Sequence, residues 1–301
     1  LTKEMSNYDN NGVGQTGPYH NQLSIQNWSA NGTPTLQWWQ TGSWTTGGQW
    51  QLGTSAGDPT TLESSGTSYV YANSDLTNLY NLPDVFTPTA GATDVTQATR
   101  SVAWLNLASD YIVVYDRAST NHTGLFKRFN LNLINSPVIS GSTATETLAD
   151  GQQLFVQSLL PQSPSITSRL SAGDLSPIAE LEPTQYTLAI QDPAMPASSR
   201  FLTVLQGADS GVTMDQASYI TTTSGQAFDG AVFSSNEVFF PVNTGVTFAS
   251  TTFPVSTGVH LILITGLTPN ARYGTLNLGN SIVVSPGGLF AADQAGVLRL
   301  T

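Results

Sequence analysis

Apolar and polar residues alternate along most of this chain with the two-residue period of a β-strand. In the segment 128–134, RFNLNLI, the apolar Phe129, Leu131 and Leu133 fall on one face and two asparagines on the other. Apolar residues spaced three and four positions apart, as a helix requires, are nearly absent. The pattern therefore predicts an all-β chain with almost no helix.

Two strand-like segments follow each other closely in the first half of the chain. The segment 100–107, RSVAWLNL, ends at a turn-like ASD, and the segment 111–118, YIVVYDRA, begins directly after it. Short turns of this kind join antiparallel neighbours, so we predict that the two segments pair. Further strand-like segments recur at short intervals up to residue 285 and indicate stacked antiparallel sheets, that is, a large β-sandwich.

The Pro- and Ser-rich segment 191–200, QDPAMPASSR, is the best candidate for a joint between domains. All six tryptophans precede it, and lighter Gly- and Thr-rich strands follow it. We predict a β-sandwich domain over 1–195 and a smaller C-terminal β-sheet domain over 196–301.

Charge and composition exclude several classes of function. The net charge is −11 and the chain contains only two lysines, which excludes a surface that tracks a nucleic-acid backbone. The longest apolar run, at 259–264, is far shorter than the ~18 residues that indicate a membrane helix, so no membrane insertion is expected. Cysteine is absent, which removes disulfides and thiolate chemistry. Many Thr, Ser, Asn and Gly residues with few charges are typical of an exported bacterial β-protein, and we expect a secreted, extracellular or periplasmic location.

Four tryptophans lie close together in the segment 36–53, LQWWQTGSWTTGGQWQLG. Aromatic rings on a β surface stack on sugar faces, and neighbouring amides bind sugar hydroxyls. Trp38, Trp39, Trp44 and Trp50 are therefore candidate carbohydrate-binding residues. The alternative is that these rings fill the core between sheets.

No motif for catalysis stands out. No spaced carboxylate pair, GxSxG, phosphate loop or HExxH occurs, so the catalytic residues are unknown. The three histidines do not share metal-ligand spacing. Asp116 and Arg117 end one apolar strand and Arg100 begins its neighbour. We predict a structural network there, in which Arg117 binds Asp116 or a loop carbonyl, against the alternative of an exposed strand end.

Three segments, taken in order, resemble the heparinase II/III-like polysaccharide lyases. The segment 19–26, YHNQLSIQ, resembles the H-N-x-L-x-I strand of that family. The segment 68–80, SYVYANSDLTNLY, is similar to its Y-x-x-x-D-x-T-x-x-Y stretch. The segment 99–120, which contains VVYDR, resembles its strand hairpin. Order, spacing and turn positions agree over 17–161.

The resemblance implies a large two-layer β-sandwich that is followed by a smaller β-domain and preceded, in the family, by an incomplete (α/α) toroid. Such proteins bind an acidic polysaccharide and cleave it by β-elimination. The Tyr and His that transfer the proton come mainly from the toroid and from an upstream stretch that this sequence lacks. The implied partners are a polysaccharide and either the missing toroid region or another copy of the chain, and the isolated chain is expected to be inactive.

The resemblance also implies a role for His20. In the family this position completes a structural divalent metal site, here expected to be zinc or calcium, with a His and an Asp from upstream. Two alternative hypotheses for the function of the chain remain. One is a non-catalytic carbohydrate-binding protein that kept the sandwich. The other is a structural surface or fibre protein whose Thr- and Asn-rich strands pack side by side.

Overall fold

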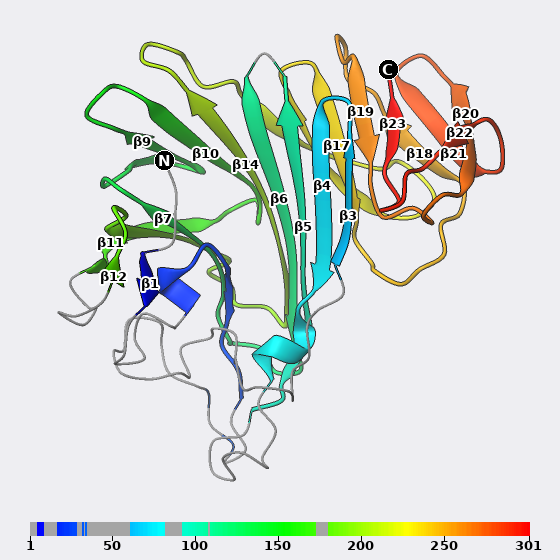
Figure 1. Ribbon diagram of the computed structural model, residues 1–301. Helices are drawn as coiled ribbons and strands as arrows, with labels where there is room; N and C mark the ends of the chain where they lie inside the picture. The colour runs from blue at the N-terminus through cyan, green and yellow to red at the C-terminus, as the bar shows by residue number, and fades with distance from the viewer. Residues whose placement is uncertain are drawn as a thin grey trace.

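Stacked β-sheets make up the part of the chain that the computed structural model describes, which is residues 5–8, 17–28, 32, 34, 61–81, 92–107, 109–172 and 180–301 (Figure 1). Within these ranges the only helical pieces are short 3-10 turns, η1 (Gly17–Tyr19) and η3 (Thr77–Tyr80), besides isolated turn residues. None of the described helical pieces is long and apolar enough to cross a membrane. The prediction of an all-β sandwich fold is confirmed.

An eight-stranded antiparallel sheet forms the centre of the molecule (Figure 1). Its strands, in spatial order, are β3 (Thr61–Gly66), β4 (Tyr69–Asp75), β5 (Val95–Asn106), β6 (Asp110–Thr120), β14 (Ser198–Ala208), β10 (Gln153–Leu160), β9 (Thr143–Thr147) and β8 (Val138–Ser140). The predicted pairing of 100–107 with 111–118 is confirmed, since Leu105 lies opposite Tyr111 and Val102 opposite Val114.

Part of the central sheet is covered on both faces, which its sequence alternation explains. In β6, Tyr111, Val113 and Tyr115 belong to one buried core, and Val114 and Ala118 belong to another. Because successive side chains of a strand point to opposite faces, a strand with apolar residues at both parities must lie between two layers.

A four-stranded sheet, the β7 sheet, covers one of these faces. Its strands are β11 (Ser165–Leu170), β13 (Tyr186–Gln191), β7 (Lys127–Leu133) and β2 (Leu23–Ile25). The predicted apolar face of β7, with Phe129, Leu131 and Leu133, packs against the central sheet. A small sheet of β1 (Ser6–Tyr8) and β12 (Glu180–Leu181) lies beside it (Figure 1).

Two further sheets cover the opposite face in succession. The five-stranded β17 sheet packs on the central sheet and consists of β15 (Ala217–Thr221), β16 (Phe228–Phe233), β17 (Asn236–Pro241), β19 (Leu261–Ile264) and β23 (Leu298–Leu300). The outer β20 sheet packs on the β17 sheet and consists of β18 (Thr251–Pro254), β21 (Ser281–Pro286), β20 (Arg272–Asn277) and β22 (Phe290–Ala291).

The division of the chain at residue 195 stays a prediction. β14 begins at Ser198, directly after it, and pairs with β6 and β10 of the central sheet. The chain therefore leaves the central sheet only after Ala208, the last residue of β14.

Candidate functional site

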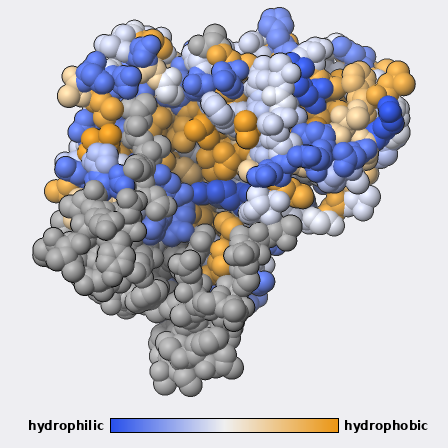
Figure 2. Space-filling view, viewed as in Figure 1, coloured by the Kyte–Doolittle hydropathy of each residue, from blue (hydrophilic) through white to orange (hydrophobic). Residues whose placement is uncertain are grey.

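One half of the central sheet has an open face on the side of the β7 sheet. Val70, Trp104 and Ile112 are cross-strand neighbours and are 41%, 39% and 37% exposed. The same row continues into Leu205 and Val156, which are only 5% and 1% exposed. At the level of this row the β7 sheet therefore ends before it reaches Ile112 of β6, and the rest of the row is exposed to solvent. Figure 2 shows apolar residues gathered in the middle of this view of the molecule.

We call this region the open face and define it by the outward residues of β3 to β6 that share the orientation of Trp104. They are Thr61, Glu63, Ser65, Val70, Ala72, Ser74, Arg100, Val102, Trp104, Asn106, Asp110 and Ile112. Apolar side chains occupy the middle of the face, and polar side chains surround them. An aromatic ring with hydroxyls, amides and carboxylates around it is the kind of surface that a sugar chain contacts.

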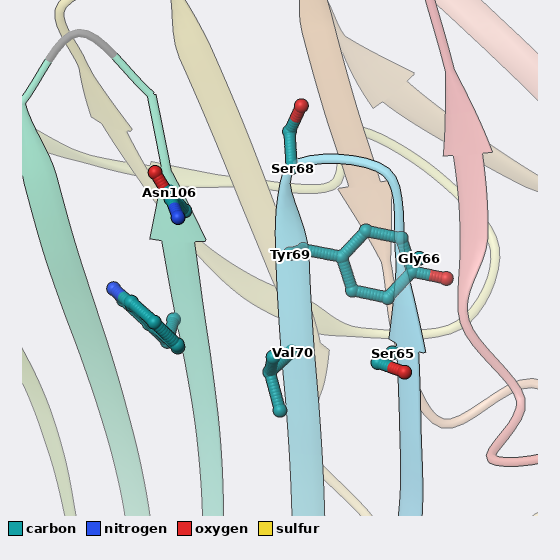
Figure 3. A pocket seen from close by; sticks show the side chains of 7 residues that line it. Ser65, Gly66, Ser68, Tyr69, Val70 and Asn106 are labelled. Carbon is teal, nitrogen blue, oxygen red and sulfur yellow. The ribbon is translucent and has the colours of Figure 1, made fainter.

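A hollow of about 290 Å³ lies at the end of the β3–β4 hairpin, beside Trp104. Ser65, Val70 and Asn106 reach it from three neighbouring strands (Figure 3). The hydroxyl of Ser65 and the amide of Asn106 supply hydrogen-bond donors and acceptors within reach of a ligand that stacks on the tryptophan.

The hairpin that carries this hollow is held rigid by Tyr69. Its ring crosses Gly66 on β3 (Figure 3), where a Cβ would lie 2.3 Å from the Tyr69 Cε1 atom, so only glycine fits. The Tyr69 hydroxyl donates a hydrogen bond of 2.6 Å to Asp293. Burial, and then this bond to a carboxylate, raises the pKa of Tyr69 well above its usual value. The tyrosine therefore ties the edge of the central sheet to the C-terminal part of the chain.

The open face ends in a bidentate ion pair. Arg100 donates through Nε and Nη2 to the two carboxylate oxygens of Asp116, at 2.7 Å each. Its Nη1 donates to the Asn21 carbonyl at 2.6 Å. Burial lowers the pKa of Arg100, but the Asp116 carboxylate more than offsets that effect and raises it overall. The guanidinium is thus a fixed and already neutralised group.

His20 directly precedes Asn21, whose carbonyl binds Arg100, and lies in the turn between η1 and β2. Its backbone N–H donates to the Gly17 carbonyl and its carbonyl accepts from Gln22. Asn21 accepts a 2.7 Å hydrogen bond from the Asn132 N–H of β7, so the turn is anchored on both sides. No three His, Asp, Glu or Cys side chains within the described ranges come together as a metal site. A metal at His20 would need ligands from elsewhere, and its role stays a prediction.

Arg117 lies on the opposite face of the central sheet from Asp116, because the two residues are consecutive in β6. It donates through Nε to the Pro241 carbonyl at 2.9 Å, and Nη2 donates to the same oxygen. Its guanidinium also lies 4.4 Å from the centre of the Tyr115 ring. The structure thus brings Arg100 and Asp116 together and holds Arg117 apart, on a carbonyl of β17.

A second polar cluster anchors the turn between β6 and β7. His122 Nδ1 lies 2.7 Å from an Asp94 carboxylate oxygen, and the His122 ring stacks on Trp28 at 4.3 Å between centroids. Asn27 accepts hydrogen bonds from the N–H groups of Trp28 and Asp94, which fixes both partners of the histidine.

The candidate sugar-binding residues Trp38, Trp39, Trp44 and Trp50 lie outside the described residues. The exposed tryptophan that the structure reveals is Trp104, which the sequence set apart from that group. Its strand neighbours are apolar on both sides in sequence, so periodicity alone assigns it to a core. Only the extent of the β7 sheet decides whether Trp104 is buried in a core or exposed to solvent.

The chain is similar to several solved structures named as heparan sulfate lyase or heparinase III. A heparan sulfate lyase from Pedobacter heparinus is 16% identical with a TM-score of 0.45, and the match covers 74% of this chain and 30% of that one. A heparinase III is 12% identical with a TM-score of 0.47, over 76% and 30% of the two chains. A heparinase III gene product is 10% identical with a TM-score of 0.49, over 77% and 31%.

This chain therefore spans less than a third of the length of each of these three structures. No model of a known protein family matches the chain, and no curated protein matches it.

Proposed function

We propose that this chain is the polysaccharide-binding β-sandwich part of a secreted polysaccharide lyase-like protein. In the complete protein it supports binding and β-elimination of an acidic polysaccharide, and it is not catalytic by itself. The motif resemblance supports the lyase-like assignment. The exposed ring of Trp104 on the open face is the observation that carries the binding function.

The open face has the shape and the chemical groups of a surface that binds a saccharide. A flat row of Val70, Trp104 and Ile112 offers an apolar surface on which the C–H face of a sugar ring stacks. Ser65 and Asn106 beside it offer groups that bind hydroxyls. In sites for small ligands, apolar and aromatic side chains supply most of the contact surface, and a few polar groups fix the orientation of the ligand.

A non-catalytic carbohydrate-binding protein is the second candidate. The open face as defined above includes neither a histidine nor a tyrosine, the pair that the lyase resemblance requires for proton transfer. Catalysis would then depend on residues outside this face. A divalent metal at His20, with the remaining ligands supplied from outside the chain, belongs to the lyase-like proposal, since a single imidazole does not form a structural zinc site.

The experiment is a comparison of saccharide binding by the wild type and Trp104→Ala, measured by isothermal titration calorimetry and by affinity gel electrophoresis. The panel contains soluble glucans and mannans together with alginate and heparan sulfate. Loss of one stacked ring is expected to weaken binding about tenfold, the equivalent of ~1.4 kcal/mol.

Two matched variants control for the fold. Trp104→Phe keeps an aromatic ring and should retain most of the affinity, whereas Leu276→Ala removes an exposed apolar side chain from β20, remote from the open face. Equal affinity of wild type and Trp104→Ala for every saccharide that binds would contradict the assignment of the site.

A further inference from the structure

The charged side chains of the open face are mostly acidic. Glu63 and Asp110 are exposed, and Asp116 lies at the buried end of the face beneath Arg100. Arg100 is the one cation of the open face as defined above. The face therefore presents a negative potential to a ligand.

The guanidinium of Arg100 is not available to a ligand anion. Two of its nitrogens donate to Asp116 and the third donates to the Asn21 carbonyl. Its side chain is only 18% exposed and that of Asp116 is fully buried. Binding a ligand carboxylate or sulfate there would require breaking a buried bidentate pair and leaving Asp116 without its partner, which is strongly unfavourable.

The charge of the whole chain acts in the same direction. The formal net charge is −11, so an approaching polyanion is repelled before it reaches the surface. Exposed carboxylates are at the same time strong acceptors for hydroxyl groups, because a charged acceptor forms the shorter and stronger hydrogen bond.

We infer that the open face takes an uncharged saccharide segment, with a sugar ring stacked on Trp104 and hydroxyl groups of the sugar units along the segment donating to Glu63 and Asp110. The inference rests on the proposed binding function and specifies its ligand class. In a complete lyase-like protein, the acidic sugar unit that is cleaved lies elsewhere, and the open face holds a neutral stretch of the chain or of a neighbouring chain.

The side chains of the open face distinguish an uncharged sugar from a uronate or a sulfated sugar. A neutral sugar can contact three kinds of group on the face: the Trp104 ring, the polar atoms of Ser65 and Asn106, and the carboxylates of Glu63 and Asp110. A polyanion gains the first two but must place its charges near Glu63 and Asp110, with no free cation of the open face to compensate. Like charges brought together in this way lower affinity and select against the wrong ligand.

The test is a salt and charge series on the full chain, with glucans and mannans as neutral probes and alginate and heparan sulfate as acidic probes. Neutral probes should bind with a Kd that changes less than about twofold between 0.1 M and 1 M NaCl, although the Debye length falls from ~10 Å to ~3 Å. Trp104→Ala should weaken this binding about tenfold, as the stacking argument above requires.

The double variant Glu63→Gln, Asp110→Asn provides the second readout. It should weaken binding of the neutral probe about threefold or more, because neutral amides are poorer acceptors for hydroxyls. Leu276→Ala is the control and should leave the affinity unchanged.

The outcomes separate the inference from the function on which it rests. Binding of acidic probes by the wild type that depends on Trp104 and weakens with salt would overturn the neutral-ligand inference and leave the binding function standing. Absence of binding to every probe would overturn both. Salt-independent binding of a neutral probe that both Trp104→Ala and the double variant weaken supports both.

Discussion

Arg117 illustrates how a single residue is stabilised by a distant part of the chain. It is 2% exposed and joins the central sheet to the end of β17 in the β17 sheet. Its hydrogen bonds go to the Pro241 carbonyl and, at longer range, to the hydroxyls of Thr99 and Ser101. Burial lowers its pKa, although the guanidinium stays charged at any ordinary pH.

Replacing this side chain should be costly. Arg117→Ala leaves a cavity and a buried carbonyl without its donor, so we expect the free energy of unfolding to fall by about 3 kcal/mol. Denaturant unfolding followed by near-ultraviolet circular dichroism measures this value. Arg299→Ala, on the exposed side of β23, is the matched control and should change stability by less than about 0.5 kcal/mol. Similar stability of the two variants would mean that the Arg117 contacts contribute nothing.

Lys127 should make stability depend on pH. Its ammonium is buried and donates to the carbonyls of Leu125 and Pro196. Burial lowers its pKa from 10.5 to about 8. Between these two pH values the unfolded chain holds more protons on this group than the folded chain does, so raising the pH favours the folded state.

We therefore expect the stability of the wild type relative to Lys127→Met to increase as the pH rises from 8 to 10.5. The slope is at most about 1.4 kcal/mol per pH unit. Thermal unfolding of both proteins across this range is the measurement, and other titrating groups cancel in the comparison. A difference that stays constant with pH would show that Lys127 keeps its ordinary pKa.

At the scale of elements, tyrosine–aspartate hydrogen bonds join the central sheet to the C-terminal part of the chain. Three tyrosines of β4 and β6 donate to carboxylates that follow residue 208 in sequence: Tyr69 to Asp293, Tyr111 to Asp215 and Tyr115 to Asp229. Asp229 also accepts a 2.6 Å bond from Tyr219 of β15 and pairs with Arg200 of β14. Together with the hydrogen bonds of Arg117, these bonds fix the orientation of the two sheets at an interface that also contains an apolar core.

This interface should loosen at alkaline pH. Burial, and then the hydrogen bond to Asp215, raises the pKa of Tyr111 from 10.0 to about 12. Burial, and then the bond to Asp229, raises the pKa of Tyr219 to about 12 as well. The folded state holds these protons while the unfolded state releases them, so stability is fully present below pH 10 and falls as the pH rises toward 12.

Thermal unfolding between pH 9 and 12 tests the alkaline effect. Tyr111→Phe should lower the melting temperature at neutral pH, because Asp215 loses a donor, and should reduce the alkaline slope. Asp215 keeps its contact with Gln206 in the variant, which preserves the local fold. An alkaline slope equal to that of the wild type would contradict the raised pKa of Tyr111.

At the scale of the whole molecule, the lyase-like resemblance predicts no turnover by this chain alone. The open face includes no histidine or tyrosine to transfer the proton of β-elimination, and the described residues do not come together as a metal site. Incubation with alginate and heparan sulfate should give no increase in the ultraviolet absorbance of unsaturated products. Robust turnover would place the proton-transfer residues within this chain.

The sequence was informative wherever a property depends on neighbouring residues. Alternation in 128–134 predicted both faces of β7, and the short link between 107 and 111 predicted the pairing of β5 with β6. A charged side chain in an apolar strand needs hydrogen-bond partners, and this requirement pointed to Arg117. Its partner on β17 lies 124 residues away, so the local sequence pattern does not reveal it.

The division of roles between sequence and tertiary structure is clearest along the row from Val70 to Val156. Local sequence is enough to predict that these residues form strands, because the two-residue period is a property of each segment. The burial of Leu205 and the exposure of Trp104 follow from the packed fold, because they depend on where the β7 sheet ends above the central sheet. Burial is set by the packing of one sheet on another, and residues far apart in the chain determine where that packing stops.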